Sequence, residues 1–358
     1  MYIYIHLPFC SSICSYCDFP KVLYEKKWIK KYLYYLKKEI ETRYKNEPVK
    51  TIYIGGGTPT CLGLEELNEL LEITNYFKKE KNIEFTIESN IESLTEEKIK
   101  LLKNFGINRI SLGVQSLNTE VLKKLNRHHN KEMIIDVISK LKNNNLTNIS
   151  IDYIYGVNND IYIIKEDIEN ILKLNIPHIS CYSLIIENGT ILKINNQKSI
   201  EDNIEEEMYK YIEKKLENNN YIHYEISNYA KKNYQSIHNL NYWNNGSYYG
   251  FGLGAVSYLN NIRTTNTKNL TKYLLGNFLQ EEQQEDINIR ISNELILGLR
   301  KLKGISINKF NKKYNKNLLD LYNIKELLKE GLLEIEDNYL KIPKKYIYIE
   351  NNILINFI

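Results

Sequence analysis

The chain has 358 residues, 43% of them hydrophobic and 26% charged, with 48 basic against 44 acidic side chains. This size allows one large domain and a smaller one. No run approaches the roughly 18 consecutive apolar residues that a membrane-spanning helix needs. The first residues resemble a strand rather than a signal peptide. The basic residues are scattered and form no block. We therefore expect a cytoplasmic protein that does not span a membrane, although peripheral contact stays open, and we do not expect nucleic acid as a partner.

Short β-rich runs alternate with amphipathic helical patterns over the first two-thirds of the chain. The strands are expected at residues 2–7, 51–54, 83–88, 109–114, 149–155 and 178–184. The helices between and after them are expected at 28–44, 64–77, 96–105, 131–143, 160–174 and 201–218. Six such units predict an α/β fold, an open (β/α)6-type partial TIM barrel, in which chemistry gathers at the carboxyl ends of the strands.

The pattern changes after residue 220, so we divide the chain into a core at 1–220, a segment at 221–286 and a C-terminal domain at 287–358. The middle segment is aromatic and glycine-rich up to 259 and then becomes a connector rich in Lys, Asn and Gln. The last part predicts helices at 293–302, 306–314 and 323–330 and strands at 333–336 and 340–342. This order is typical of a small winged-helix-like domain, for which we expect a docking or covering role.

Three of the five cysteines, Cys10, Cys14 and Cys17, form a C-x3-C-x2-C loop after the first expected strand. Three thiolates on one short loop can hold three corners of an iron–sulfur cubane and leave the fourth iron open. The alternatives are a zinc site, which would need a fourth ligand, and a disulfide, which is disfavoured in a cytosolic chain. Cys61 and Cys181 are isolated, and we expect small buried side chains there.

The cysteine loop resembles the signature of the radical S-adenosylmethionine family, in which the cofactor binds the open iron of a [4Fe-4S] cluster. The run Gly55-Gly56-Gly57-Thr58-Pro59 resembles the family's glycine-rich element, where backbone without a Cβ can approach the cofactor. Glu88, at the end of the third expected strand, resembles the family's acidic residue that accepts from a ribose hydroxyl. The resemblance implies a barrel that carries one [4Fe-4S] cluster and binds S-adenosyl-L-methionine.

Further motifs resemble those of the oxygen-independent coproporphyrinogen III oxidase group. They are Arg109-Ile-Ser-Leu-Gly-Val-Gln115-Ser, Arg127-His-His129 and Ile151-Asp152. The match implies the following residues around S-adenosyl-L-methionine: Tyr4, Tyr16, Gly56, Gly57, Thr58, Glu88, Gln115, Arg127 and Asp152. An alternative is that Arg127 and Asp152 form an internal ion pair of the barrel, since buried charges are normally paired.

Two features favour the heme-chaperone branch of this group over the oxidase. The oxidase has a fourth cysteine two positions after the third, where this chain has Phe19, and it has an N-terminal arm before the first strand. The second feature is His238-Asn239-Leu-Asn-Tyr242-Trp243, which resembles the branch's heme-binding element. A histidine can ligate heme iron and aromatic rings can enclose the macrocycle. A structural role for His238 is the alternative, and His6 is the main competing ligand.

The sequence therefore predicts a heme chaperone that carries a [4Fe-4S] cluster, S-adenosyl-L-methionine and heme and passes heme to an acceptor protein. The rival hypothesis is an oxygen-independent coproporphyrinogen III dehydrogenase or another radical enzyme of porphyrin metabolism. Whether the chain is a catalyst stays open at this stage, and so does the identity of the acceptor.

Overall fold

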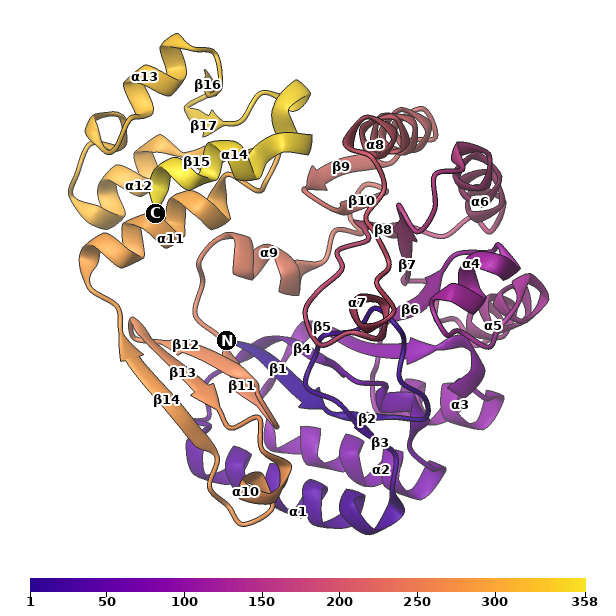
Figure 1. The fold of residues 1–358 in the computed structure, drawn as a ribbon. Coiled ribbons are helices and arrows are strands. Elements are labelled where there is room, and N and C mark those ends of the chain that lie inside the picture. Colours follow the sequence, from indigo (N-terminus) through magenta and orange to yellow (C-terminus); the bar gives the residue numbers. More distant parts are fainter.

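A nine-stranded sheet forms the centre of the computed structural model, which describes residues 1–358 (Figure 1). Its strand order is β11-β1-β4-β5-β6-β7-β8-β10-β9, so the two edges stay apart and the sheet is open. Seven of its strands pair in parallel, and six of these confirm the six expected from sequence: β1 (Tyr2–Leu7), β4 (Val49–Gly56), β5 (Lys79–Asn90), β6 (Arg109–Gln115), β7 (Ile149–Tyr155) and β8 (His178–Ser183).

Helices cover the outer face of this sheet (Figure 1). They are α1 (Lys26–Arg43), α2 (Leu64–Ile73), α3 (Glu96–Asn104), α4 (Thr119–Lys124), α5 (Lys131–Asn143), α6 (Ile161–Lys173) and α8 (Asp202–Glu217). Alternation along β1 explains the layering, because Ile3, Ile5 and Leu7 are fully buried in the large apolar core. Tyr4 and His6 occupy the intervening positions and point to the inside of the barrel, where the Tyr4 ring lies near Tyr53.

Strands beyond the six extend the sheet on both sides. β11 (Tyr249–Phe251) pairs parallel with β1, while β9 (Ile222–Glu225) and β10 (Asn228–Ala230) form an antiparallel pair beside β8. Two short strands, β2 (Phe9–Cys10) and β3 (Val22–Leu23), pair with each other and bracket the cysteine loop. The short helices α7 (Ile191–Ile194) and α9 (Ile237–Trp243) complete this part of the chain.

The residues after 259, which were expected to form a polar connector, contain two strands and a helix. These strands, β13 (Ile262–Asn266) and β14 (Leu279–Gln284), form an antiparallel sheet with β12 (Val256–Leu259), which precedes them, and α10 (Leu270–Tyr273) lies between β13 and β14. β14 escapes sequence reasoning because every one of its residues is exposed, which removes the apolar alternation that marks a strand.

The C-terminal part is a smaller unit of helices and strands, as expected. It contains α11 (Ile287–Gly298), β15 (Ile305–Ser306), α12 (Ile307–Tyr314), α13 (Ile324–Lys329), β16 (Glu334–Glu336), β17 (Tyr339–Lys341) and α14 (Glu350–Leu354). The predicted limits of the first helix, 293–302, are wrong, because α11 begins at Ile287 and ends at Gly298. The Asp286 carboxylate accepts the backbone N–H groups of Asn288 and Ile289, so it caps the helix and starts it at 287.

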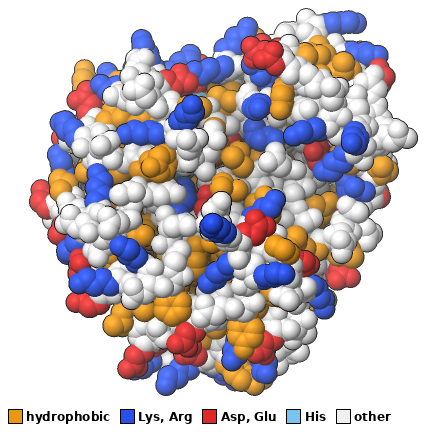
Figure 2. Space-filling model, turned by 180° about the vertical axis from the view of Figure 1, so that it is seen from behind, with side chains coloured by type: hydrophobic (Ala, Val, Ile, Leu, Met, Phe, Trp, Pro, Cys, Tyr) orange, Lys and Arg blue, Asp and Glu red, His pale blue; other side chains and the backbone are white.

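The chain also contains six short 3-10 helices: η1 (Pro59–Cys61), η2 (Thr74–Tyr76), η3 (Ile91–Ser93), η4 (Leu318–Asp320), η5 (Lys344–Ile349) and η6 (Ile355–Phe357). No helix has both the length and the apolar character needed to cross a membrane. On the face drawn in Figure 2, basic and acidic side chains are interspersed, which agrees with the small net charge of the chain.

Candidate functional site

The three cysteines of the loop line one pocket of about 380 Å³ at the carboxyl end of the parallel strands. The loop is held against the segment after α4, because Ser15 N–H donates to the Leu125 carbonyl at 3.2 Å and the Asn126 amide to the Ile13 carbonyl at 2.7 Å. Burial raises the pKa of Cys10 to about 11, so this thiol keeps its proton until a metal displaces it.

The three cysteines lie on one loop without converging on a single point. Nowhere in the chain do three or more His, Cys, Asp or Glu side chains converge so that they could hold one ion. A zinc site needs such a convergence on one atom, whereas a cubane spreads its thiolates over separate iron corners. Cys61 and Cys181 stay outside the pocket, and the Cys61 thiol instead contacts the Phe9 carbonyl at 3.4 Å.

The structure brings the sequence-derived cofactor residues together with one exception. The pocket lining includes Tyr16, Gly56, Gly57, Thr58, Glu88, Gln115, Arg127 and Asp152. Tyr4 is the exception, because its hydroxyl lies within the barrel and is hydrogen-bonded to His6 Nδ1 at 2.9 Å. A direct contact between Tyr4 and a molecule in this pocket is therefore not supported.

Glu88 lies across the end of β4 and is fixed at both oxygens. Its carboxylate accepts the Tyr53 hydroxyl at 2.7 Å and the Gly56 backbone N–H at 3.0 Å. A Cβ on Gly55 would lie 2.6 Å from the Glu88 carboxyl carbon, so only glycine leaves room for this side chain. The first glycine of the run therefore serves the acidic residue rather than a ligand.

The other two glycines also pack against the protein itself. Gly56 has φ +109°, and a Cβ there would lie 2.5 Å from the His6 ring. A Cβ on Gly57 would lie 2.5 Å from the Phe9 carbonyl oxygen, and its N–H donates to the Leu7 carbonyl. Gly56 and Gly57 therefore pack tightly against neighbouring strands and loops, and both also line the cysteine pocket.

Two buried carboxyl groups in the pocket have raised pKa values. Burial raises the pKa of Glu88 to about 7, and the charge of Asp152 contributes to this shift. Burial likewise raises the pKa of Asp152 to about 6, against the hydrogen bonds from Ser180 and Ser111 and the charge of Arg109. Strong shifts of this kind are typical of functional sites, since a structural carboxylate is usually paired so that it stays ionised.

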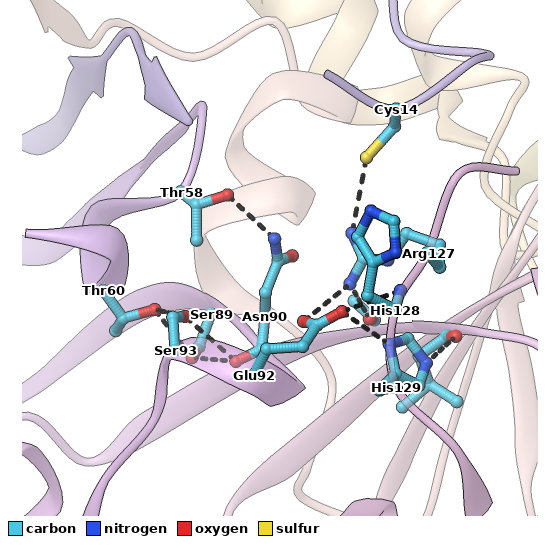
Figure 3. Close-up of polar contacts among 12 residues, drawn as sticks. Cys14, Thr58, Thr60, Ser89, Asn90, Glu92, Ser93, Arg127, His128 and His129 are labelled. Atoms are coloured by element: carbon cyan, nitrogen blue, oxygen red, sulfur yellow. Dashed lines mark hydrogen bonds and ion pairs between the residues drawn. The ribbon is translucent and has the colours of Figure 1, made fainter. Parts of the chain in front are cut away.

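Arg127 joins the cysteine loop to the end of β6 (Figure 3). One guanidinium nitrogen lies 3.5 Å from the Cys14 sulfur, and the other donates to the Gly113 carbonyl at 2.6 Å. The carboxylate partner of Arg127 is Glu92, at 3.8 Å, and no ion pair with Asp152 forms. The alternative of an internal Arg127–Asp152 pair is therefore not supported.

Glu92 is a site residue that sequence reasoning missed. It accepts from His129 Nδ1 at 3.1 Å and from the His128 backbone N–H at 3.2 Å, while His129 Nε2 bonds the Val114 carbonyl (Figure 3). Burial works to raise the pKa of Glu92, but the His129 hydrogen bond and the Arg127 charge outweigh it and lower the pKa to about 2. This carboxylate therefore stays ionised and orients Arg127.

Gln115 reaches the pocket through an unusual backbone. It has φ +66°, a left-handed conformation that is uncommon outside glycine, and the register between β6 and β7 shifts beside it. A Cβ on Gly113 would lie 2.9 Å from the Gln115 amide nitrogen and 3.2 Å from the Asn90 amide oxygen. Asn90 also lines the pocket and donates to Thr58 at 3.1 Å. Its position two residues after Glu88, on the same strand face, is a signal that could have identified it.

His238 lies in the core. It is 1% exposed, its Nδ1 is hydrogen-bonded to Thr51 at 2.6 Å and its Nε2 to the Tyr242 hydroxyl at 2.9 Å. Its ring stacks on Tyr53, and its backbone N–H donates to Glu84. Burial and the Arg109 charge lower the pKa of His238 to about 3, so the imidazole is neutral. With both nitrogens bonded, His238 offers no free ligand atom, and the expectation of heme ligation is not supported in this conformation.

The other residues of the expected heme element share this environment. Tyr242 is committed to His238 and packs edge-on against Tyr248, and Trp243 lies beneath the Arg300 guanidinium. The backbone N–H of Asn239 donates to the Ser236 hydroxyl, which caps α9. His6 is engaged in the same way as His238, since Nδ1 bonds Tyr4 and Nε2 bonds the Pro20 carbonyl.

Comparisons with known proteins identify the family of the chain. Residues 4–175 match the radical SAM superfamily and residues 289–345 match the HemN C-terminal domain. The chain is 37% identical to "Heme chaperone HemW" of Lactococcus lactis, over 99% of this chain and 96% of that protein, and 36% identical to "Heme chaperone HemW" of Bacillus subtilis, over 92% of each.

The fold is also similar to a solved structure. Coproporphyrinogen III oxidase (HemN) from Escherichia coli, described as a radical SAM enzyme, superposes with a TM-score of 0.88 over 99% of this chain and 89% of that chain. The two are 20% identical, so this likeness shows a shared fold and no more. Together with the near full-length similarity to the Lactococcus and Bacillus proteins, these findings show that the chain belongs to the HemW family of radical SAM proteins.

Proposed function

We propose that this protein is a cytoplasmic heme chaperone that carries a [4Fe-4S] cluster, binds S-adenosyl-L-methionine and passes heme to an acceptor protein. The observation that carries the proposal is the near full-length similarity to proteins named heme chaperones, in a chain whose cysteine pocket retains the cofactor residues. Cys10, Cys14 and Cys17 are the proposed cluster ligands. A cluster bound there would supply an open iron for the amino and carboxylate groups of the cofactor.

The residues of the pocket have distinct proposed roles. Glu88 and Asp152 accept hydrogen bonds from hydroxyl groups of the cofactor. Burial disfavours their ionised forms and raises their pKa values, so hydrogen-bond donors from a ligand would stabilise both carboxylates. Arg127, fixed by Glu92, supplies positive charge beside Cys14 and offsets the negative charge of ligating thiolates. Thr58, whose hydroxyl lies 4.0 Å from the Cys10 sulfur, positions the loop on the other side.

The position of Phe19 supports a chaperone rather than the oxidase. Phe19 stands where the oxidase has its fourth cysteine, and its side chain is 60% exposed at the rim of the pocket. An exposed aromatic ring at a pocket mouth can contact an apolar molecule but cannot ligate metal or donate a proton. The proposed cofactor residues thus line the pocket, while a residue specific to the oxidase is replaced.

An anaerobic activity assay tests this proposal. Protein reconstituted with iron and sulfide is incubated with coproporphyrinogen III, S-adenosyl-L-methionine and a reductant, and the porphyrinogens are oxidised and separated. We expect no protoporphyrinogen beyond the level of the Cys14→Ala control, which shares the fold but lacks a proposed ligand. Multiple turnovers to protoporphyrinogen would favour the dehydrogenase and overturn the chaperone assignment.

A further inference from the structure

A second cavity lies on the side of α9 that faces away from the barrel. It has a volume of about 810 Å³, within the ~300–1,000 Å³ typical of small-molecule sites. Residues from three parts of the chain line it: the β9 strand, the α9 helix and the C-terminal unit. In Figure 1, α9 lies between the central sheet and that unit.

The helix α9 separates this cavity from the barrel interior. His238 and Tyr242, one turn apart, bond each other on the barrel side. Leu240 and Asn244, also one turn apart, line the cavity, since positions two residues along a helix point to nearly opposite faces. The sequence element expected to hold heme therefore borders a cavity, but with its other face.

Four lysines surround the cavity: Lys301, Lys303, Lys309 and Lys313. Glu294 is the single acidic residue of the lining, and it pairs with Lys313 at 2.6 Å. Lys301 donates to the Asn244 amide oxygen. Burial lowers the pKa of Lys301 to about 8; Glu294 acts against this shift, and the charges of the other three lysines add to it. The charges repel one another, so a bound anion would relieve an unfavourable arrangement.

The rest of the lining is largely apolar. Its hydrophobic members are Ile222, Tyr224, Leu240, Leu302, Ile305, Phe310 and Tyr339. A ligand that matches both features has a broad apolar body and carries more than one negative charge at its edge. An inorganic anion would leave the apolar surface uncovered, and a neutral apolar ligand would leave Lys301, Lys303 and Lys309 without an anionic partner.

We propose that this cleft, lined by the four lysines and α9, is the porphyrin site of the protein, in which lysines bind the propionates and the apolar wall covers the macrocycle. The proposal rests on the chaperone function proposed above and names where the heme is held. It also places the porphyrin on the opposite face of α9 from His238.

The histidines indicate how heme is held in this cleft. In His6, His129, His178, His223 and His238, both ring nitrogens are hydrogen-bonded within the protein. Of these, only His223 lines the cleft, where Glu213 and the Ile226 carbonyl engage its nitrogens. No histidine nitrogen is thus free to ligate iron in the cleft. We expect recognition there to depend on the carboxylates and the apolar face of the porphyrin, and not on a bond between histidine and iron.

The test is a spectroscopic titration of the full chain with heme, protoporphyrin IX and the dimethyl ester of protoporphyrin IX. The variant K301Q/K303Q/K309Q/K313Q removes the four charges. The matched control K26Q/K30Q/K31Q/K103Q removes four exposed lysines of α1 and α3, outside the cleft, for the same change in net charge. We expect the cleft variant to bind heme about tenfold or more weakly than wild type, since each exposed ion pair contributes up to roughly fivefold in affinity. The control should stay within about twofold.

The ligand series separates carboxylate recognition from iron ligation. Protoporphyrin IX should bind about as tightly as heme, and its dimethyl ester about tenfold or more weakly. Equal heme affinity in the cleft variant and wild type would overturn the cleft assignment and leave the chaperone function standing, whereas a wild type that binds no heme would overturn both. Loss of binding to duplex DNA or RNA in the cleft variant, with heme binding kept, would identify a nucleic-acid site and contradict the proposal.

Discussion

Replacing Glu88 by Gln should change the stability of the cofactor-free protein, relative to wild type, in a way that depends on pH. The variant should gain stability over wild type as the pH rises. Burial raises the pKa of Glu88 from its usual 4.5 to about 7. A carboxyl group whose pKa is raised by folding binds its proton more tightly in the folded state than in the unfolded state. The folded protein therefore loses stability as the pH rises from about 4.5 through 7. For this shift the loss amounts to roughly 3 kcal/mol well above pH 7, and to less than about 1 kcal/mol at pH 5.

Gln carries no charge at either pH, so the variant escapes this loss. It also weakens the hydrogen bonds that Glu88 accepts from Tyr53 and Gly56, and because these bonds favour the ionised carboxylate, their dependence on pH is already contained in the pKa of Glu88. Urea unfolding at pH 5 and pH 8 measures both proteins. We expect the stability of Glu88→Gln relative to wild type to increase by about 2 kcal/mol between the two. A difference that is constant or moves the other way would refute the ionisation state assigned to this site.

Further outcomes follow from the same geometry. Cys14→Ala should lose the iron–sulfur absorbance and most bound iron after reconstitution, while Cys181→Ala retains both, and full iron content in the first variant would contradict the ligand assignment. Affinity for S-adenosyl-L-methionine, measured by calorimetry, should fall as pH drops below about 7 in wild type, because protonated Glu88 accepts hydrogen bonds poorly, and this dependence should weaken in Glu88→Gln. His238→Ala should cost about 1–3 kcal/mol of stability and keep heme binding, and a loss of heme binding without loss of stability would restore it as a ligand. Glu92→Gln should lower the free energy of unfolding by about 1–3 kcal/mol at pH 7. This cost should shrink as the pH falls from 4.5 toward 2, because wild-type Glu92 becomes protonated in that range and no longer stabilises the fold by its charge. A cost that does not depend on pH would rule out the ion pair.

The parallel core could be predicted from sequence because each of its strands is marked by a buried apolar run between helical repeats. β1 and β7 match their expected limits residue for residue. Of the others, β4 and β5 are twice their expected length, β6 is longer by one residue and β8 is shorter by one. The cysteine pocket was predictable for a related reason: residues at the carboxyl ends of adjacent parallel strands meet at one edge of the sheet. Glu88, Gln115 and Asp152 come together by this rule.

The remaining features depend on contacts that a one-dimensional pattern does not carry. The partner of Arg127 is Glu92, a residue in an unremarkable turn, and nothing in its spacing distinguishes it from a surface glutamate. His238 sits in a motif rich in aromatic rings, which favoured a ligand role, yet the long-range contact with Thr51 engages it in the core. The lysines of the second cavity lie in the C-terminal unit, where the sequence shows only a polar surface with ordinary spacing.

The central claim is that the protein hands on heme and does not modify a porphyrin. The most direct measurement is the rate at which protein loaded with one equivalent of heme transfers it to the apo form of a b-type cytochrome under anaerobic conditions, followed in the acceptor's Soret band. We expect a transfer rate that rises with acceptor concentration and exceeds the rate of spontaneous heme release, because transfer occurs within a complex of the two proteins. A rate that equals spontaneous release at every acceptor concentration would contradict it.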